Sequence, residues 1–447
     1  MEAVLFILQL LVVLGCIVMG TRSSGVGLGL WGGAGVAILV FVFQLSPGSP
    51  PVDALLIVLS VVLAASMMQV AGGIDWMVSV AAKLIARNPK QITLVAPLVS
   101  FLFAAGAGTS NILYPLLPVI QDLSYRNGIR PSRPLSLSVV ATGVALACSP
   151  VSAAMAAMVT LTDVPPYDFE LIDILKVTIP AAVVGIVLSS LVVNRLGKDL
   201  ADDPEVQAKI ASGELAPPRA GAAEVKADVT VTKAGRNAAI IFLTGVLAIV
   251  MFGLFKGIRP LDAEGDPVGM TPIIEIVMFL VGTVILIVSR PKVADVPTAT
   301  VFKAGMVSAI ALFGLAWLTD TFLSAHVEFI SESIGALVGA APWIFALGVF
   351  LVCVLTTSQS TATRTIVPIG LAAGIPLGVL SGMWAGAFAG IYLLPTNGSQ
   401  IAAANFDVSG TTKLGTKLVD HSFFLPTLIL AVTTIGAGAA FGALWGG

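Results

Sequence analysis

Charged residues are scarce in this chain of 447 residues: only 11% are Asp, Glu, Lys or Arg, and 57% are hydrophobic. A soluble domain carries about 25% charged residues. The net charge of −2 also excludes the basic surface that a nucleic-acid-binding protein needs. Apolar stretches of about 20 residues recur along the chain, and each is long enough to cross a bilayer. Alternating hydropathy of the β-barrel type is absent, so we predict an all-α polytopic membrane protein embedded in the lipid bilayer.

Cysteine and histidine are also scarce. Cys16, Cys148 and Cys353 lie far apart, and none belongs to a CxxC motif, so no disulfide framework is indicated. His326 and His421 lack the spacing of metal ligands. The sequence contains no Walker motif, no Ser-His-Asp arrangement and no dinucleotide-binding turn. We therefore expect neither an enzyme nor a protein with a bound cofactor.

Ten apolar segments are predicted to be transmembrane helices, in two groups separated by a polar, solvated linker at 195–236. The first segment carries Glu2 where a signal peptide has Lys or Arg, so we expect it to remain as an uncleaved span. Two shorter segments, 75–88 and more weakly 327–339, are amphipathic and predicted to lie at the membrane surface. The predicted spans are 3–20, 26–44, 53–71, 135–162, 171–194, 237–255, 272–289, 303–323, 380–406 and 422–443.

The two halves of the sequence correspond to one another at a shift of 245 residues. Pro97 then corresponds to Pro342, and Pro150 corresponds to Pro395. The identity between the halves is weak, but corresponding interrupted segments in two halves are the usual pointer to the binding site of a transporter. We therefore predict an internal repeat formed by residues 1–194 and 237–447.

Lys and Arg residues sort to one side of the membrane. Nineteen of the 23 lie in alternate loops, which the positive-inside rule places in the cytoplasm. Both loops around 91–125 are basic, so that segment is predicted to enter and leave from the cytoplasm as a re-entrant hairpin. The loops around 342–371 lack Lys and Arg, so that hairpin is predicted to enter from outside. The result is an inverted-topology repeat with about ten spans, two opposed hairpins and both termini outside.

Four polar interruptions occur within the apolar segments. Two lie at the hairpin tips, 106–111 and 356–364, and two break the spans 135–162 and 380–406 near Pro150 and Pro395. Irregular backbone at membrane depth is tolerated only inside protein or along a watery cavity. Helix N-termini at such breaks suit a carboxylate, whereas freed carbonyls and hydroxyls can hold Na⁺.

Any single Ser or Thr at these breaks has an alternative role in helix packing or capping, but four clustered breaks favour a binding site. Ser110, Asn111, Ser358 and Asn397 are also candidates for a Na⁺ site, and no other metal ligand set is predicted. The predicted substrate-binding residues are Thr109, Ser110, Asn111, Ser149, Ser152, Thr357, Ser358, Gln359, Ser360, Thr361, Thr363, Arg364, Thr396 and Asn397.

Arg364 is the most informative of these residues because it lies at or near membrane depth, where a charge is costly. Guanidinium pairs with carboxylate through two hydrogen bonds, so substrate contact is the favoured role. An ion pair with Asp407 or Glu275, or a side chain that reaches the interface, is the alternative. Glu275, Asp320 and Asp407 are candidates for a coupling proton, with helix-end capping as the more ordinary role.

Several motifs resemble the anaerobic C4-dicarboxylate transporter (Dcu) family over essentially the whole chain. They are GLWGGAGVAILVFVFQLSPGSPPVDALLIV at 29–58, RNPKQITLVAP at 87–97, NGIRPSRPLS at 127–136 with SPVS at 149–152, and LLPTNGSQIAAANFDVSGTTKLG at 393–415. The resemblance implies exchange or uptake of fumarate, malate, aspartate and succinate across the bacterial inner membrane. It also implies kinship with ion-coupled elevator-type carriers. The family reads GTGH at the first hairpin tip, where this chain has Asn111, so a proton-carrying role at that position is not expected here.

We therefore predict a secondary transporter of C4-dicarboxylates that works by antiport and an elevator-type alternating-access step. The hairpins and the spans they pack against would move, and the spans within 3–71 and 237–323 would form a scaffold at a homodimer interface. A Na⁺- or H⁺-coupled symporter of another organic anion is the main alternative. A channel or a membrane enzyme is a weaker one, since no nucleophile-base pair or metal cluster converges.

Overall fold

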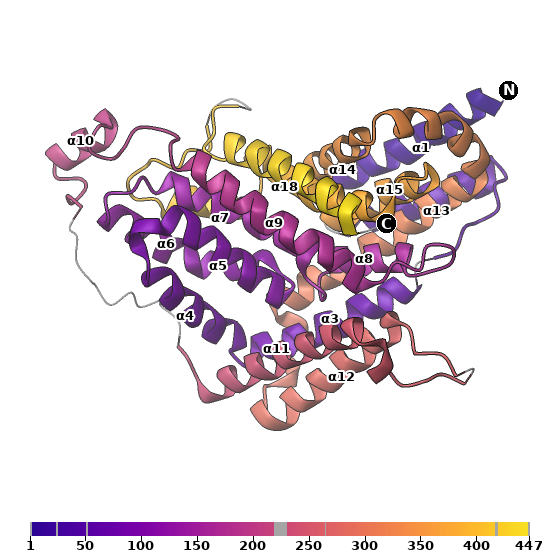
Figure 1. Ribbon diagram of the computed structural model, residues 1–447, viewed down its shortest axis with the longest axis horizontal. Coiled ribbons are helices and arrows are strands. Elements are labelled where there is room, and N and C mark those ends of the chain that lie inside the picture. Colours follow the sequence, from indigo (N-terminus) through magenta and orange to yellow (C-terminus); the bar gives the residue numbers. More distant parts are fainter. Residues whose placement is uncertain are drawn as a thin grey trace.

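The computed structural model is built from helices (Figure 1) and describes all residues except 1, 24–25, 51, 219–229, 264, 416–418 and 446–447. Within the described residues the only β pairing is an isolated bridge between Leu261 and Pro267. The predicted all-α polytopic class is confirmed. The long helices form because apolar side chains repeat without a break over some 20 residues, and a helix satisfies every backbone hydrogen bond internally.

The helices of the first half follow the predicted spans closely. They are α1 Glu2–Ser23, α2 Gly27–Ala37 with a π-helical turn at Ile38–Val42, α3 Val52–Val70, α4 Gly73–Ala86, α5 Ile92–Ala107, a 3₁₀ segment Ser110–Leu116, α6 Leu117–Arg126, α7 Ser132–Val144, a 3₁₀ turn Ala145–Cys148, α8 Ala153–Thr162 and α9 Leu171–Val193. α3 and α4 meet at an angle of 75°, so the amphipathic segment 75–88 is a separate helix, as predicted.

The second half has the same order of elements. After α10 Pro204–Ala211 in the linker come α11 Lys233–Leu254, α12 Met270–Ser289, α13 Thr300–Ala340, α14 Trp343–Thr356, α15 Gln359–Ala372, α16 Leu377–Ala387, a 3₁₀ turn Phe388–Tyr392, α17 Gly398–Phe406 and α18 Phe424–Trp445. One difference concerns 327–339, which was predicted to be a separate amphipathic segment. In the structure these residues belong to α13, which is helical from Thr300 to Ala340; their side chains lie outside the described residues.

Seven helices in the described part of the chain are long and apolar enough to cross a membrane, or up to eight if the bent pair of α3 and α4 counts as one span. One of the seven, Pro89–Ala107, forms the first arm of the predicted hairpin 91–125. Four further apolar helices are shorter: Val4–Gly20, Gly27–Val42, Trp343–Thr356 and Leu377–Tyr392. The number of ten spans and the re-entrant course of the hairpins therefore stay predictions.

Two groups of helices pack within themselves and meet along a boundary. We call α1, α2, α3, α11, α12 and α13 the wall group, and we call α5 to α9 together with α14 to α18 the hairpin group, which includes both tips and both breaks. Glycines bring the backbones close within each group. A Cβ on Gly314 of α13 would lie 1.9 Å from the carbonyl oxygen of Gly29 in α2, and one on Gly382 of α16 would lie 2.1 Å from that of Gly438 in α18. Close backbone approach of this kind fixes neighbouring helices in membrane proteins.

Most residues in the described part of the linker are exposed, and a few of its side chains anchor it to the hairpin group near Tyr125. Leu200, Val206 and Leu215 form a small apolar core with Tyr125, and the Tyr125 hydroxyl donates a hydrogen bond to the carbonyl of Ala216 at 2.6 Å. Ion pairs add to this contact: Arg130 with Asp203, Arg133 with Asp199 at 2.7 Å, and Lys413 with Glu205 at 2.7 Å. The prediction overlooked these contacts because Tyr125 and the linker lie about 80 residues apart in sequence.

Candidate functional site

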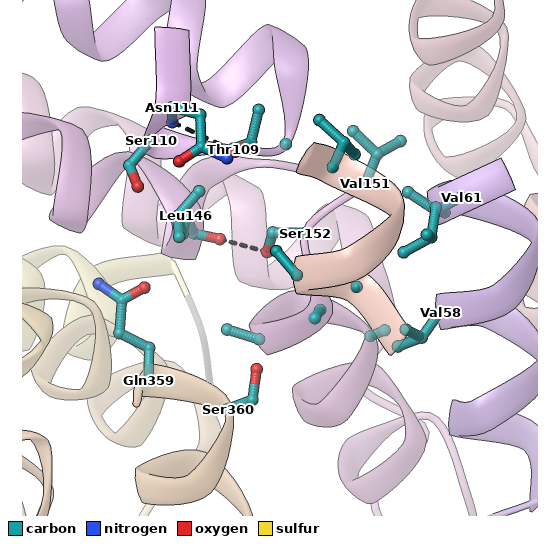
Figure 2. A pocket seen from close by; sticks show the side chains of 18 of the residues that line it. Val58, Val61, Thr109, Ser110, Asn111, Leu146, Val151, Ser152, Gln359 and Ser360 are labelled. Atoms are coloured by element: carbon teal, nitrogen blue, oxygen red, sulfur yellow. Dashed lines mark hydrogen bonds between the residues drawn. The ribbon is translucent and has the colours of Figure 1, made fainter. Parts of the chain in front are cut away.

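A cavity of about 380 Å³ lies where the four polar breaks meet. Figure 2 shows the first hairpin tip, Thr109 to Asn111, across the cavity from Gln359 and Ser360 of the second tip, with Ser152 between them. The lining residues are Ile57, Val58, Val61, Val62, Ala65, Ala107, Gly108, Thr109, Ser110, Asn111, Leu146, Val151, Ser152, Ala153, Ala154, Ala156, Val301, Ala304, Gly305, Thr357, Ser358, Gln359, Ser360, Ile391, Tyr392 and Asn397.

The first tip is a tight turn between α5 and a 3₁₀ segment. Gly108 ends α5 in the left-handed conformation with φ of 67°, and a Cβ there would lie 2.7 Å from the carbonyl oxygen of Val151. Only glycine accommodates both demands without strain. Thr109 is extended, and its hydroxyl accepts a hydrogen bond from the backbone N–H of Asn111 at 3.2 Å. The tip is therefore held directly against the break at Val151 and Ser152.

The break between α7 and α8 is organised by Ser152. Its hydroxyl donates to the carbonyl of Leu146 at 2.6 Å and accepts from the N–H of Met155 at 3.0 Å, which caps α8. Pro150 removes one backbone donor here, and the loop before it leaves the Leu146 carbonyl without a helical partner. The serine thus satisfies one end of each helix and presents the start of α8 to the cavity.

The second tip has the same design with different residues. Thr357 ends α14 in the left-handed conformation with φ of 49°, and the Ser358 hydroxyl caps α15 by accepting from the N–H of Thr361 at 3.2 Å. Gln359 donates its side-chain amide to the carbonyl of Gly143 in α7 at 2.8 Å. This bond joins the second tip to α7, the helix on the N-terminal side of the break near Pro150.

The break between α16 and α17 is closed by a capping box. The Asn397 side-chain oxygen accepts from the Ser399 N–H at 3.1 Å and from the Ser399 hydroxyl at 2.9 Å, while the Gln400 side chain accepts from the Asn397 N–H at 3.1 Å. Gln400 also donates to the Tyr392 carbonyl at 2.9 Å. Reciprocal capping of this kind fixes where a helix starts, so α17 begins at the edge of the cavity.

Helix N-termini therefore converge on the cavity. The cap residue and first two residues of α8 (Ser152, Ala153, Ala154) and of α15 (Ser358, Gln359, Ser360) line it, together with the cap residue of α17, Asn397. Each N-terminus carries free N–H groups and about half a positive charge. None of the lining residues is Asp, Glu, Lys, Arg or His. The arrangement is suited to an anion.

The opposite side of the cavity is apolar. α3 contributes Ile57, Val58, Val61, Val62 and Ala65, and α13 contributes Val301, Ala304 and Gly305. Figure 2 shows Val58 and Val61 on a different side of the cavity from the two tips. The lining residues with polar side chains thus belong to the tips and the breaks, and the wall group contributes only apolar or small ones.

The structure brings nine of the predicted site residues together at the cavity: Thr109, Ser110, Asn111, Ser152, Thr357, Ser358, Gln359, Ser360 and Asn397. The four candidates for a Na⁺ site are among them. Whether any of these residues touches substrate stays a prediction, because proximity to a cavity does not identify its occupant.

The other five predicted residues do not line the cavity. Ser149 is buried, and its hydroxyl accepts from the N–H of Val151 at 3.4 Å. Thr361 donates to the Ser358 hydroxyl at 2.8 Å, and Thr363 bridges the Gln359 carbonyl and the Trp384 indole, each at 2.8 Å. Thr396 is exposed.

Arg364 is buried behind the second tip. It follows Ser360 by four residues in α15, so it lies on the same helix face about 6 Å further from the tip. Only 4% of the residue is exposed, and its Nε and Nη2 atoms have no hydrogen-bond partner among the described residues. The suggested partner Asp407 is occupied elsewhere: its carboxylate accepts hydrogen bonds from Ser409, Thr411 and Thr412. A buried guanidinium whose hydrogen bonds are not made is costly, and an anion bound next to it would lower that cost.

Sequence reasoning overlooked Tyr392, which lines the cavity and is 1% exposed. Its ring packs on Gly143, where a Cβ would lie 2.5 Å from the Tyr392 Cε2 atom. Its hydroxyl contacts the side chains of Thr142 and Ser399. The signal available in the sequence was its position three residues before Pro395, at the start of a break.

The fold resembles that of known transporters. It matches the YdaH transporter of Alcanivorax borkumensis with a TM-score of 0.59 at 14% identity, over 99% of this chain and 97% of that chain. It also matches MtrF of Neisseria gonorrhoeae, described within a class of antimetabolite efflux pumps, with a TM-score of 0.56 at 14% identity, over 92% and 84%. At this identity the likeness concerns the fold alone: an all-helical fold that membrane transporters use.

Sequence relatives define the family. Residues 5–446 match the family described as anaerobic C4-dicarboxylate membrane transporters. The chain is 36% identical over 445 residues to the anaerobic C4-dicarboxylate transporter DcuB of Escherichia coli O6:H1, with 99% of each chain covered. It is 32% identical over 440 residues to the C4-dicarboxylate transporter DcuA of Wolinella succinogenes, with 98% of each covered. The chain belongs to this family, as its motifs predicted, and is a membrane transporter rather than an enzyme.

Proposed function

We propose that the protein exchanges C4-dicarboxylates, among them fumarate, malate, aspartate and succinate, across the bacterial inner membrane. The observation that carries the proposal is the convergence of the α8, α15 and α17 N-termini on one cavity without ionisable lining residues other than Tyr392. Small-molecule pockets have volumes of about 300–1,000 Å³, and a four-carbon acid fits easily in 380 Å³. The names of the relatives DcuB and DcuA support the same substrate class.

A substrate with two carboxylates needs two positive regions. α8 and α15 both start at the cavity, and they come from different halves of the chain. Each N-terminus can receive one carboxylate through backbone N–H groups, which are dipoles rather than full charges. Such a site stabilises an anion without a fixed counter-ion that would hold it too firmly for release.

Arg364 adds a full positive charge to one side of this site. We propose that one substrate carboxylate reaches it by way of Ser360 and satisfies the free Nε and Nη2 atoms. The wall group offers the substrate no hydrogen bond, so the carboxylates are held by the hairpin group alone.

The separation between a hairpin group that binds the substrate and a wall group that makes no polar contact with it suits an elevator-type step. A substrate held only by the hairpin group can travel with it past the apolar faces of α3 and α13 without breaking hydrogen bonds to them. The hairpins would open on opposite sides of the membrane, as the inverted repeat 1–194 and 237–447 predicts, which gives alternating access around one site. The wall group would stay fixed, at a homodimer interface, with both chain termini in the periplasm.

Na⁺- or H⁺-coupled symport is the alternative to exchange. Ser110, Asn111, Ser358 and Asn397 place neutral oxygen atoms at the cavity, and hard cations prefer oxygen ligands. A cation bound there would be expected to raise the affinity for the dicarboxylate by charge compensation.

Counterflow in liposomes tests the proposal. Purified protein is reconstituted in vesicles loaded with unlabelled succinate, and labelled fumarate or aspartate is added outside with either Na⁺ or K⁺. Exchange predicts uptake that requires internal dicarboxylate and is equal in both salts. Uptake into empty vesicles that depends on Na⁺ or on a proton gradient would favour symport. An absence of uptake with both labelled acids, and with labelled malate and succinate tested in the same way, would refute the substrate class.

A further inference from the structure

A buried ion pair joins the hairpin group to the wall group at one end of the molecule. Arg259, just after α11, donates from Nη2 to Glu170 Oε2 at 2.5 Å and from Nη1 to Glu170 Oε1 at 3.3 Å. Only 2% of the Arg259 side chain and 11% of the Glu170 side chain are exposed. Lys256 adds a contact from the surface at 2.9 Å, with 63% of its side chain exposed.

Each residue of the pair also completes the end of a helix. Glu170 caps α9 through a capping box with Asp173. The Arg259 Nε atom donates to the carbonyl of Phe252 at 2.8 Å, near the C-terminal end of α11. The helix dipole stabilises a carboxylate at a helix N-terminus and a cation at a helix C-terminus. The pair therefore fixes the start of α9 directly to the end of α11.

The position of the pair distinguishes it from the other ion pairs of the described residues. Apart from the contact of the exposed Lys256 with the same carboxylate, those either lie within one helix or connect the linker to the hairpin group. Glu170 belongs to the loop between α8 and α9 and Arg259 to the loop after α11, so this contact crosses the boundary between the hairpin and wall groups. Any displacement of α9 along α11 has to separate the two side chains.

We propose that Glu170 and Arg259 form a latch that holds the hairpin group against the wall group in this conformation and opens in each transport cycle. The proposal rests on the elevator step proposed above. Separating the two side chains inside the protein would leave a buried charge without its partner, which is costly. When α9 moves, Glu170 keeps its cap and Arg259 keeps the Phe252 carbonyl, so neither helix end frays.

Distance measurements between spin labels test the latch. Asp168 and Ile258 flank the pair and are exposed, and the three native cysteines are buried, so Asp168→Cys and Ile258→Cys can be labelled without touching the latch. We expect a short distance to dominate, with a longer one gaining population in the Glu170→Gln background. Glutamine retains an oxygen that can cap α9 while it removes the charge. Lys256→Gln, which removes the exposed charge, is the matched control and should change the distribution little. The same single distance in all three backgrounds would overturn the latch.

Crosslinking adds a functional readout. Glu170→Cys and Arg259→Cys, bridged by a methanethiosulfonate crosslinker, should abolish counterflow while leaving succinate binding intact, and reduction should restore transport. The control bridges Gln69→Cys and Thr300→Cys, whose side chains meet at 2.6 Å between α3 and α13 inside the wall group, and should leave counterflow unchanged. Normal counterflow with the 170–259 bridge in place would overturn the latch. Failure of the proposed function would show instead as no counterflow in the unbridged protein, and the label distances would still decide whether the helix ends separate.

Discussion

The two hairpin tips share one plan but supply different chemistry. At the second tip, Ser358 caps a regular α-helix of 14 residues that carries Arg364 one turn behind the cavity. At the first tip, Thr109 leads into a 3₁₀ segment of seven residues with Asn111 at the cavity. A 3₁₀ segment has poorer hydrogen-bond geometry than an α-helix. The comparison suggests that the second tip attracts the carboxylate and the first tip provides neutral oxygen and nitrogen atoms. The two tips are thus alike in their turns and caps and unlike in charge.

The largest effect is expected from Arg364→Ala. A hydrogen bond to a charged group contributes about 1.5–3 kcal/mol, so the affinity for succinate should fall about 10- to 100-fold. Arg364→Lys keeps the charge and should recover part of the loss. The measurement is the half-saturating succinate concentration for counterflow, with thermal unfolding as the control for folding. A stable Arg364→Ala protein with an unchanged half-saturating concentration would show that the charge at the second tip does not contribute to succinate affinity.

The next effect separates the two caps. Ser358→Ala removes the cap of α15, which contributes about 1 kcal/mol to stability at a typical helix N-terminus; because the start of α15 is then less well held, succinate affinity should fall measurably. Thr109→Ala removes the cap of the 3₁₀ segment and should cost about twofold or less. Val58→Ala, on the apolar wall of the same cavity, is the control for a change in volume. Equal losses of succinate affinity in Ser358→Ala and Thr109→Ala would show that the two caps contribute equally to binding.

Asn111→Ala tests the neutral role of the first tip. The substitution removes an amide group from the cavity but no charge, so the dependence of half-saturation on pH and on membrane potential should stay as in the unchanged protein. Any stimulation of uptake by Na⁺ should be lost if the amide oxygen is a ligand. Titration of Na⁺ against counterflow rate checks both points, and a loss of succinate affinity as large as that of Arg364→Ala would contradict them.

The smallest effect lies outside the cavity. Burial, and then the nearby charge of Glu170, raises the pKa of Asp163 to about 6, although Arg259 and Lys256 oppose the shift. The folded protein therefore binds this proton more tightly than the unfolded chain, and the stabilisation by protonation is lost as pH rises from about 4 to about 6. Asp163→Asn should raise the midpoint of thermal unfolding at pH 7 and leave it nearly unchanged at pH 4. A midpoint lowered at both pH values would show that the carboxylate is needed in its charged form.

The sequence predicted the helices and the four breaks well for physical reasons. Long apolar runs have one stable form in a membrane, and Gly108, Pro150 and Pro395 interrupt them where the structure has its turns. The residues at the ends of those turns could therefore be named as site candidates before their neighbours were known.

The remainder depended on three-dimensional contacts. Whether Arg364 lines the cavity or lies behind it depends on the rotation of α15 about its axis. Residues are buried on several sides of this helix, so its sequence pattern does not indicate which side faces the cavity. Tyr392 enters the cavity because Gly143 makes room for its ring, a relation across about 250 residues. The docking of the linker on Tyr125 and the pairing of Glu170 with Arg259 are also long-range contacts without a local pattern.

The apolar faces of α3 and α13 have a consequence for how relatives with other substrates arise. Because these faces contribute no polar side chain to the cavity, the proposed binding mode predicts that a change of substrate needs substitutions only at the tips and breaks. The packing of the wall helices, including the close approach of Gly29 and Gly314, can then persist unchanged while selectivity diverges. Selection can thus act on recognition and on mechanical support through separate sets of residues.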